Sequence, residues 1–225
     1  MHPLDNPIWH ALTTRQSSVA EVCGKAVRFI PDVSPLGGLE DPSEGSFASL
    51  GTLLQSGTKV GLFLHELPKL SVGWEIASSG DLLQMIHDGP MVHEPIPDVL
   101  RLGDTDAVEM TELAHLTKPG PFHPKTHELG EFFGIRRDGT LAAMAGERLR
   151  LPGYTEISAV CTHPQHLGRG YAGWLVSLLI ERIRRRSETP FLHVRGDNNR
   201  AIALYERLGF KTRLQYHYVV LRRKA

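Results

Sequence analysis

The segment Tyr154–Gly170, with the sequence YTEISAVCTHPQHLGRG, constrains the fold more than any other part of the chain. Its largely apolar run at Ile157–Cys161 predicts a strand, and Pro164 ends the ladder because proline has no N–H. Gly168 and Gly170 then form a turn. Apolar residues follow at helical spacing, at Tyr171, Trp174, Leu175, Leu178, Leu179 and Ile183. The segment therefore predicts a strand, a glycine loop and a helix in succession.

The glycine loop suits a phosphate or pyrophosphate, because backbone N–H groups would converge beside the positive end of the following helix. Gly168 and Gly170 lack the Cβ atoms that keep an anion away from the backbone. Plain turn chemistry explains two glycines before a helix equally well. The segment has neither the Lys-Ser/Thr pair of a P-loop nor a GxGxxG pattern. An anion site here would be of another kind.

A second segment, NNRAIALYERLGF at 198–210, predicts a helix with Asn198 as its N-cap and Gly209 as its stop. Together the two segments resemble the GNAT superfamily of acyl-CoA-dependent N-acyltransferases. The first matches that family's Q/RxxGxG/A pyrophosphate loop and the second its NxxAxxLYxxxGF signature, through Gln165, Gly168, Gly170, Asn198, Ala201, Leu204, Tyr205, Gly209 and Phe210. The resemblance covers residues from about 98 to 222.

The resemblance implies an α/β fold with a mixed sheet, and a catalytic GNAT domain at residues 98–225. Residues 1–97 match much less clearly and form a smaller N-terminal α/β half. That half is either a degenerate GNAT-like copy, as in the two-part glycine N-acyltransferase-like architecture, or an unrelated α/β cap. The proline-rich stretch GPMVHEPIPD at 89–98 predicts a linker between the halves. We expect the N-terminal half to wall the acceptor site or to form an interface, without binding acyl-CoA.

The chain order of predicted elements is typical of a mixed α/β protein. The C-terminal part reads as strand, helix, hairpin, strand, helix, strand, helix and strand, and the hairpin turn is Asp138-Gly139. In the N-terminal part the patterns predict a helix over 8–26, a strand at 28–30, a loop at 31–45, a helix at 47–54, a strand at 58–66, and weaker strand or helix segments at 72–76 and 82–86.

Composition narrows the class of protein. The 225 residues include 25 Lys and Arg against 25 Asp and Glu, so the formal net charge is zero and no basic footprint for nucleic acid is expected. No apolar run approaches the roughly 20 residues of a membrane span, and we expect neither a membrane partner nor a leader. Cys23 and Cys161 read as free thiols in a reducing compartment. The expected location is therefore cytoplasmic.

By resemblance, acetyl-CoA is the co-substrate, and its pantetheine amides pair with the backbone of Val160 and Thr162. An unpaired strand edge is a template for such pairing. The full set of expected cofactor-binding residues is Val160, Cys161, Thr162, Gln165, His166, Leu167, Gly168, Arg169, Gly170, Tyr171 and Asn198. We expect no metal, because Pro124 interrupts the four-residue spacing of His123 and His127 and a third ligand is lacking. These histidines are alternatively part of the acceptor pocket.

Two residues are candidates for catalysis. Tyr205 shares a helix face with Ala201 and Leu208, and by resemblance its hydroxyl protonates the leaving thiolate. Glu156 is the candidate general base for the amine, acting directly or through water, although an ordinary strand carboxylate paired with an arginine fits equally well. Cys161 is disfavoured as a nucleophile, because no base is implied beside it.

The expected function is transfer of an acetyl group from acetyl-CoA to a primary amine of a small molecule or amino acid, by direct attack in a ternary complex. One alternative is a non-catalytic GNAT-fold protein that binds acyl-CoA or a partner. Another is an acetyltransferase for protein N-termini or lysines. Neither the acceptor nor the assembly follows from the sequence, and a homodimer stays open.

Overall fold

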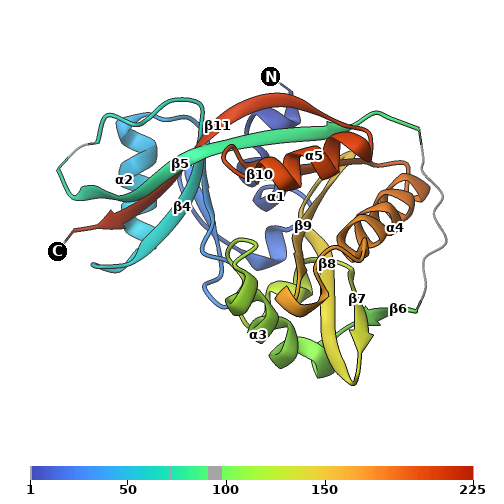
Figure 1. Ribbon diagram of the computed structural model, residues 1–225. Helices are drawn as coiled ribbons and strands as arrows, with labels where there is room; N and C mark the ends of the chain where they lie inside the picture. The colour runs from blue at the N-terminus through green and yellow to red at the C-terminus, as the bar shows by residue number, and fades with distance from the viewer. Residues whose placement is uncertain (1, 71, 91–97, 225) are drawn as a thin grey trace.

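The computed structural model describes residues 2–70, 72–90 and 98–224 (Figure 1). Its main feature is a mixed eight-stranded sheet with the order β4-β11-β5-β10-β9-β8-β7-β6. Among the described strands of this sheet, β9 and β10 form the parallel pair and the other neighbours are antiparallel. The strands are β4 (Lys59–Leu64), β5 (Trp74–His87), β6 (Val99–Leu102), β7 (Phe132–Arg137), β8 (Thr140–Leu151), β9 (Tyr154–Thr162), β10 (Thr189–Arg195) and β11 (Phe210–Arg223). The predicted mixed-sheet fold is confirmed.

Helices cover both faces of this sheet. Successive residues of β8 belong to different cores: Ala143 and Ala145 pack with α4, whereas Met144 packs with α3. Because neighbouring strand residues point to opposite faces, α3 and α4 lie on opposite sides. The helices are α1 (Pro7–Leu12), α2 (Glu44–Leu53), α3 (Ala107–Thr117), α4 (Tyr171–Arg185) and α5 (Asn199–Arg207). None of the described helices is long and apolar enough to cross a membrane.

The N-terminal part adds a three-stranded sheet of β1 (Ala20–Cys23), β2 (Ala26–Phe29) and β3 (Gly37–Leu39). Its core continues directly into the large sheet, since Ile8 and Phe29 share one buried cluster with Leu149 of β8 and Phe191 of β10. Removing this part would therefore expose apolar surface of the large sheet to water.

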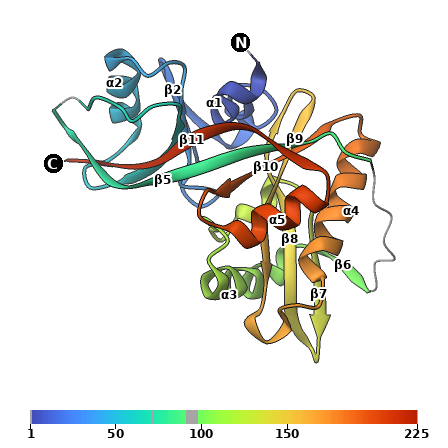
Figure 2. The ribbon, with the colours of Figure 1, turned by 45° about the horizontal axis from the view of Figure 1, so that its top comes forward.

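Strands from before and after residue 97 belong to the same eight-stranded sheet. β5, from the N-terminal side, lies between β10 and β11, and it pairs with β11 along almost its whole length (Figure 2). The division into halves at residue 97 therefore does not separate two sheets. Most of the predicted linker, at 91–97, lies outside the described residues.

Several predicted elements differ from the structure. The helix predicted over 8–26 is wrong, because α1 ends at Leu12. The hydroxyls of Thr13 and Thr14 donate to carbonyls of the preceding turn, and the chain then turns into β1. Residues 74–76 of the segment at 72–76 and the whole segment at 82–86 belong to one strand, β5, and the loop at 31–45 contains β3. The strand at 58–66, the helix at 47–54 and the Asp138-Gly139 hairpin are confirmed in place.

Candidate active site

The site begins where β9 and β10 separate. Their parallel pairing stops at Ile157 and Leu192. Just beyond, β9 carries a bulge against β8, where the register shifts and Ala159 adopts a left-handed φ of 53°. Within the described residues, the backbone from 158 to 162 therefore has no strand partner on the β10 side. The sequence did not predict this bulge, which opens a strand edge to an extended molecule.

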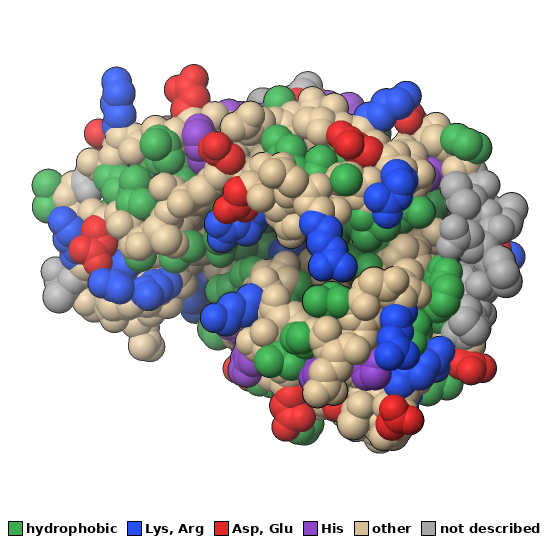
Figure 3. Space-filling model, viewed as in Figure 1, with side chains coloured by type: hydrophobic (Ala, Val, Ile, Leu, Met, Phe, Trp, Pro, Cys, Tyr) green, Lys and Arg blue, Asp and Glu red, His purple; other side chains and the backbone are tan. Residues whose placement is uncertain are grey.

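A cavity of about 1150 Å³ fills the space between the separated strands. In Figure 3 a hollow with basic side chains at its rim lies between α5 and α3. Of the predicted cofactor residues, ten line this cavity: Val160, Cys161, Thr162, His166, Leu167, Gly168, Arg169, Gly170, Tyr171 and Asn198. The exception is Gln165, which is exposed and lies outside the lining.

The glycine loop presents its backbone to this cavity. Gly168 and Gly170 have φ of 79° and 80°, a conformation that favours glycine, and Gly170 is the N-cap of α4. A Cβ placed on Gly168 would meet no atom within 4 Å, so the space beside the loop is open. Arg169 lies within the loop, and Arg137 donates to the Tyr171 hydroxyl at 3.1 Å. A helix N-terminus flanked by arginines is a suitable environment for a phosphate.

Tyr205 lies on α5 and faces the same cavity. Its side chain is packed edge to face against Phe210, with ring centroids 5.9 Å apart. Burial raises the pKa of Tyr205 far above its ordinary value, so the hydroxyl stays protonated at neutral pH. The helix begins as predicted, because the Asn198 side chain accepts from the Ala201 N–H at 3.2 Å. Among the described residues, the Tyr205 hydroxyl has no hydrogen-bond partner.

Glu156 forms a fully buried polar cluster with Arg148 and His193. Its carboxylate accepts two hydrogen bonds from Arg148, at 2.8 and 2.6 Å, and one from the Nδ1–H of His193 at 2.7 Å. Burial opposes ionisation, but these partners outweigh it and lower the pKa of Glu156 to about 2. Glu156 does not line the cavity. The expectation that Glu156 is the general base, directly or through water, stays a prediction.

Arg148 and His193, which the sequence reasoning missed, do line the cavity. Burial lowers the pKa of His193, so the imidazole is neutral, with Nδ1 donating to Glu156 and Nε2 accepting from the Gln84 amide at 3.1 Å. The Arg148 guanidinium lies over the ring of Phe63, with its carbon 5.8 Å from the centroid. A histidine inside the apolar strand 191–194 was the available signal.

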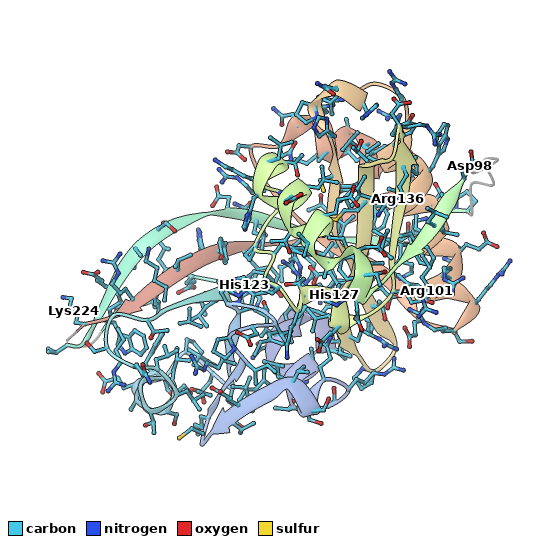
Figure 4. All side chains as sticks on the ribbon, turned by 90° about the horizontal axis from the view of Figure 1, so that it is seen from below. Asp98, Arg101, His123, His127, Arg136 and Lys224 are labelled. Carbon is cyan, nitrogen blue, oxygen red and sulfur yellow. The ribbon has the colours of Figure 1, made fainter. Side chains whose placement is uncertain are left out.

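The remaining predicted groups take structural positions. Cys161 is a buried free thiol, and burial raises its pKa to about 11. His123 and His127 are labelled in Figure 4. His123 bonds the Pro31 carbonyl and His127 bonds Asp104, and neither lines the cavity. These histidines therefore tie loops together, and their alternative place in the acceptor pocket stays a prediction.

The mixed sheet, its separated strands and the glycine loop at the start of α4 define the fold class of GNAT acyltransferases. The family model described as "FR47-like protein" matches residues 132–219. A solved structure of a putative acetyltransferase from the GNAT family, from Novosphingobium aromaticivorans DSM 12444, is 39% identical, with 100% of both chains covered and a TM-score of 0.94. The chain therefore belongs to the GNAT family, as the resemblance implied.

More distant structures agree in fold alone. A GCN5-related N-acetyltransferase from Kribbella flavida is 18% identical, covers 97% of this chain and 96% of its own, and has a TM-score of 0.62. A GCN5-related N-acetyltransferase-like protein from Streptococcus suis 89/1591 is 13% identical, covers 97% and 94%, and has a TM-score of 0.61. No curated protein matches the chain.

Proposed function

We propose that this chain transfers an acetyl group from acetyl-CoA to a primary amine of a small molecule or amino acid, by direct attack within one cavity. The observation that carries the proposal is the arrangement around that cavity. An unpaired strand edge at 158–162, a glycine loop at a helix N-terminus and a protonated tyrosine all line it. These features match the needs of a pantetheine arm, a pyrophosphate and a leaving thiolate, respectively.

Tyr205 is the proposed general acid. When the neutral amine attacks the thioester carbon, the C–S bond breaks and the sulfur takes the electron pair. The Tyr205 hydroxyl gives its proton to that sulfur, so the leaving group departs as the thiol of CoA. The attacking nitrogen loses its surplus proton to water as the amide forms, and the Tyr205 phenolate takes a proton back from water. The raised pKa keeps the phenol protonated until the thiolate develops. Backbone N–H groups near Val160 would stabilise the oxyanion.

Glu156 is proposed as a positioning residue. It holds the His193 imidazole in one tautomer and holds the Arg148 guanidinium at the cavity wall. The amine proton is lost to water before attack, since an α-amine has a pKa near 8 and about a tenth of it is neutral at pH 7. A buried thiol with a pKa of about 11 makes Cys161 a poor nucleophile, which favours direct transfer.

In this proposal, the two predicted parts of the chain have different roles. Residues 98–225 supply the cofactor-binding strand, loop and helix. Leu36, Phe63 and 78–82, from the N-terminal side, line the same cavity and would wall the acceptor. We also propose a cytoplasmic location, because free thiols such as Cys161 are typical of a reducing compartment.

Calorimetric titration with acetyl-CoA tests the proposal, with propionyl-CoA, longer acyl-CoAs and free CoA in parallel. We expect saturable one-site binding of acetyl-CoA, followed by thiol release when amines are added. Binding without thiol release from any amine would favour a non-catalytic acyl-CoA-binding protein. Absence of binding to every CoA species would refute the proposed site itself.

A further inference from the structure

One edge of β5 lies open beyond the end of β10. β10 pairs with β5 only from Leu82 to Ile86, and a last hydrogen bond joins the Gly196 N–H to the Asp81 carbonyl at 3.0 Å. The chain then leaves the sheet toward α5, whereas β5 continues back to Trp74. Within the described part of the chain, the backbone from 74 to 80 has hydrogen-bond partners only on the β11 side.

This edge is uncovered as well as unpaired. Residues 76–81 are six consecutive exposed residues, although the strand lies inside an eight-stranded sheet. Ile76 is 41% exposed, and the residues that follow it are small. A Cβ placed on Gly80 would meet no atom within 4 Å. Unsatisfied backbone groups on an open edge are a template for pairing with another strand.

The open edge borders the same cavity as the glycine loop. Residues 78–82 line the cavity, and so does the segment 117–121 that follows α3. The far end of β5, near Trp74, lies away from α4 at the other end of the long sheet (Figures 1 and 2). A molecule lying along the edge would therefore have one end in the cavity and the other outside it.

We propose that this edge binds the acceptor as an extended peptide, whose N-terminal amine is the acetylated group. The peptide would add to β5 as an antiparallel strand in continuation of β10. Since β10 also runs antiparallel to β5, the peptide's N-terminus would lie beside the end of β10 at Arg195, where β9 and β10 separate. This inference rests on the proposed acetyl transfer to a primary amine, and it replaces the small-molecule acceptor of that proposal with a peptide.

One carboxylate at the cavity end of the edge, that of Asp81, can attract an N-terminal ammonium group, and the nearby charge of Arg195 is balanced by its ion pair with Asp197 at 2.7 Å. Asp81 lines the cavity, and its side chain is 58% exposed. Its carboxylate lies at the point where the amine of an added strand would begin. His217 approaches the same carboxylate at 3.4 Å. Asp81 would attract the cationic amine, which then loses its proton before attack.

A peptide satisfies this edge better than a small amine does. Strand edges offer N–H and C=O groups with a period of two residues, and a peptide backbone supplies the complementary groups at the same period. A free amino acid would pair with one position and leave the rest of 74–80 unpaired. A lysine side chain would place its own backbone several ångströms from the reacting amine.

The test compares acetylation of an alanine α-amine in a peptide with acetylation of the same amine in a free amide, both at saturating acetyl-CoA. The probe is the lysine-free hexapeptide Ala-Ser-Val-Ser-Val-Gly, amidated at its C-terminus, and the reference is alaninamide. We expect kcat/KM at least about tenfold higher for the hexapeptide, since two net hydrogen bonds contribute that much or more. Backbone N-methylation at residue 3 or residue 4 then supplies a matched pair. One of these N–H groups faces β5 and the other faces away. KM should therefore rise about fivefold for one methylated peptide and less than twofold for the other.

Asp81→Asn should raise KM for the hexapeptide about threefold and leave acetyl-CoA affinity unchanged. Asp88→Asn is the matched control, because Asp88 is similarly exposed but lies outside the cavity in an ion pair with Lys211. Equal use of alaninamide and hexapeptide, or equal effects of the two methylations, would refute the strand-edge acceptor and keep the acetyl transfer. Preference for a lysine peptide with a blocked N-terminus would refute it too. Failure to acetylate any amine would refute the proposed function and this inference together.

Discussion

Arg148 and Glu156 face each other in a two-point ion pair, with Nε and Nη2 donating at 2.8 and 2.6 Å, where Glu156 is fully buried and Arg148 borders the cavity. The pair carries no net charge, and its carboxylate also fixes the ring of His193. A buried pair of this kind adds little stability by itself, but removal of one partner leaves the other charge uncompensated. The pair therefore sets the shape of the cavity wall.

Glu156→Gln should lower the free energy of unfolding at pH 7 by about 3–5 kcal/mol, because it leaves the Arg148 charge buried without a counterion. Urea denaturation followed by circular dichroism measures the change. Glu206→Gln is the matched control, since Glu206 is exposed on α5, and it should stay within about 0.5 kcal/mol of the wild type. Equal effects of the two substitutions would contradict the ion-pair assignment.

The free energy of unfolding should also depend on pH, through the titration of Glu156. Its pKa is about 2 in the folded chain and 4.5 ordinarily, so the unfolded state binds the proton more readily. The stabilisation is complete above pH 4.5 and is lost as the pH falls toward 2. Urea denaturation at pH 5, 4 and 3 should therefore show the gap between wild type and Glu156→Gln narrowing with acid. A gap that stayed constant over this range would show that the folded-state pKa is ordinary.

Tyr205→Phe should lower kcat by about 10²-fold or more and leave acetyl-CoA affinity unchanged, because it removes the proton donor and keeps the ring. Thiol release measures the first quantity and calorimetry the second. Tyr154→Phe is a suitable control, since the Tyr154 hydroxyl bonds His2 outside the cavity. A Tyr205→Phe enzyme with wild-type kcat from pH 6 to 9 would remove the general-acid role.

Gly168→Glu should abolish acetyl-CoA binding in calorimetry, because it places a side chain and a negative charge where the pyrophosphate would lie. The control is Gly153→Glu. Gly153 has a φ of 80°, has open space around its Cβ position, and lies in the turn between β8 and β9. Both substitutions carry the same backbone strain, so only the site effect differs. Retained affinity in Gly168→Glu would refute the loop assignment.

Cys161 should resist alkylation near neutral pH. Because its pKa is raised to about 11, the thiolate fraction should grow about tenfold for each pH unit between 8 and 10. Iodoacetamide labelling followed by mass spectrometry gives the rate for each thiol, with the half-buried Cys23 as internal reference. A labelling rate at Cys161 that levels off below pH 8 would revive the nucleophile hypothesis.

Local signals predicted the turn, the helix cap and the hairpin of the C-terminal part of the chain. The glycine turn before α4, the Asn198 cap of α5 and the Asp138-Gly139 hairpin each depend on residues that are close in sequence. Such interactions are fixed by backbone preferences and capping, which periodicity and composition can reveal. The expected residues of the glycine loop that line the cavity follow from these signals, whereas Val160, Cys161 and Thr162 line it because of the bulge in β9.

The features that the sequence could not show depend on pairings between residues that are far apart in the chain. Glu156 reads equally well as a free base or as a paired carboxylate. Its pairing depends on His193, on a different strand, and on Arg148, which lies at a register shift of β8 against β9. The length of β5 is another example. Its exposed stretch at 76–81 has no apolar alternation, so only pairing with β11 makes it a strand.

The place of β5 between β10 and β11 has a consequence for synthesis. A nascent chain makes β5 long before either of its neighbours exists, and the second of them, β11, is the last strand of the sheet. Until β11 leaves the ribosome, one edge of β5 is without its partner and the wall of the cavity cannot close. We therefore expect cofactor binding to appear only after translation has passed β11, with the nascent chain protected from aggregation until then by chaperones.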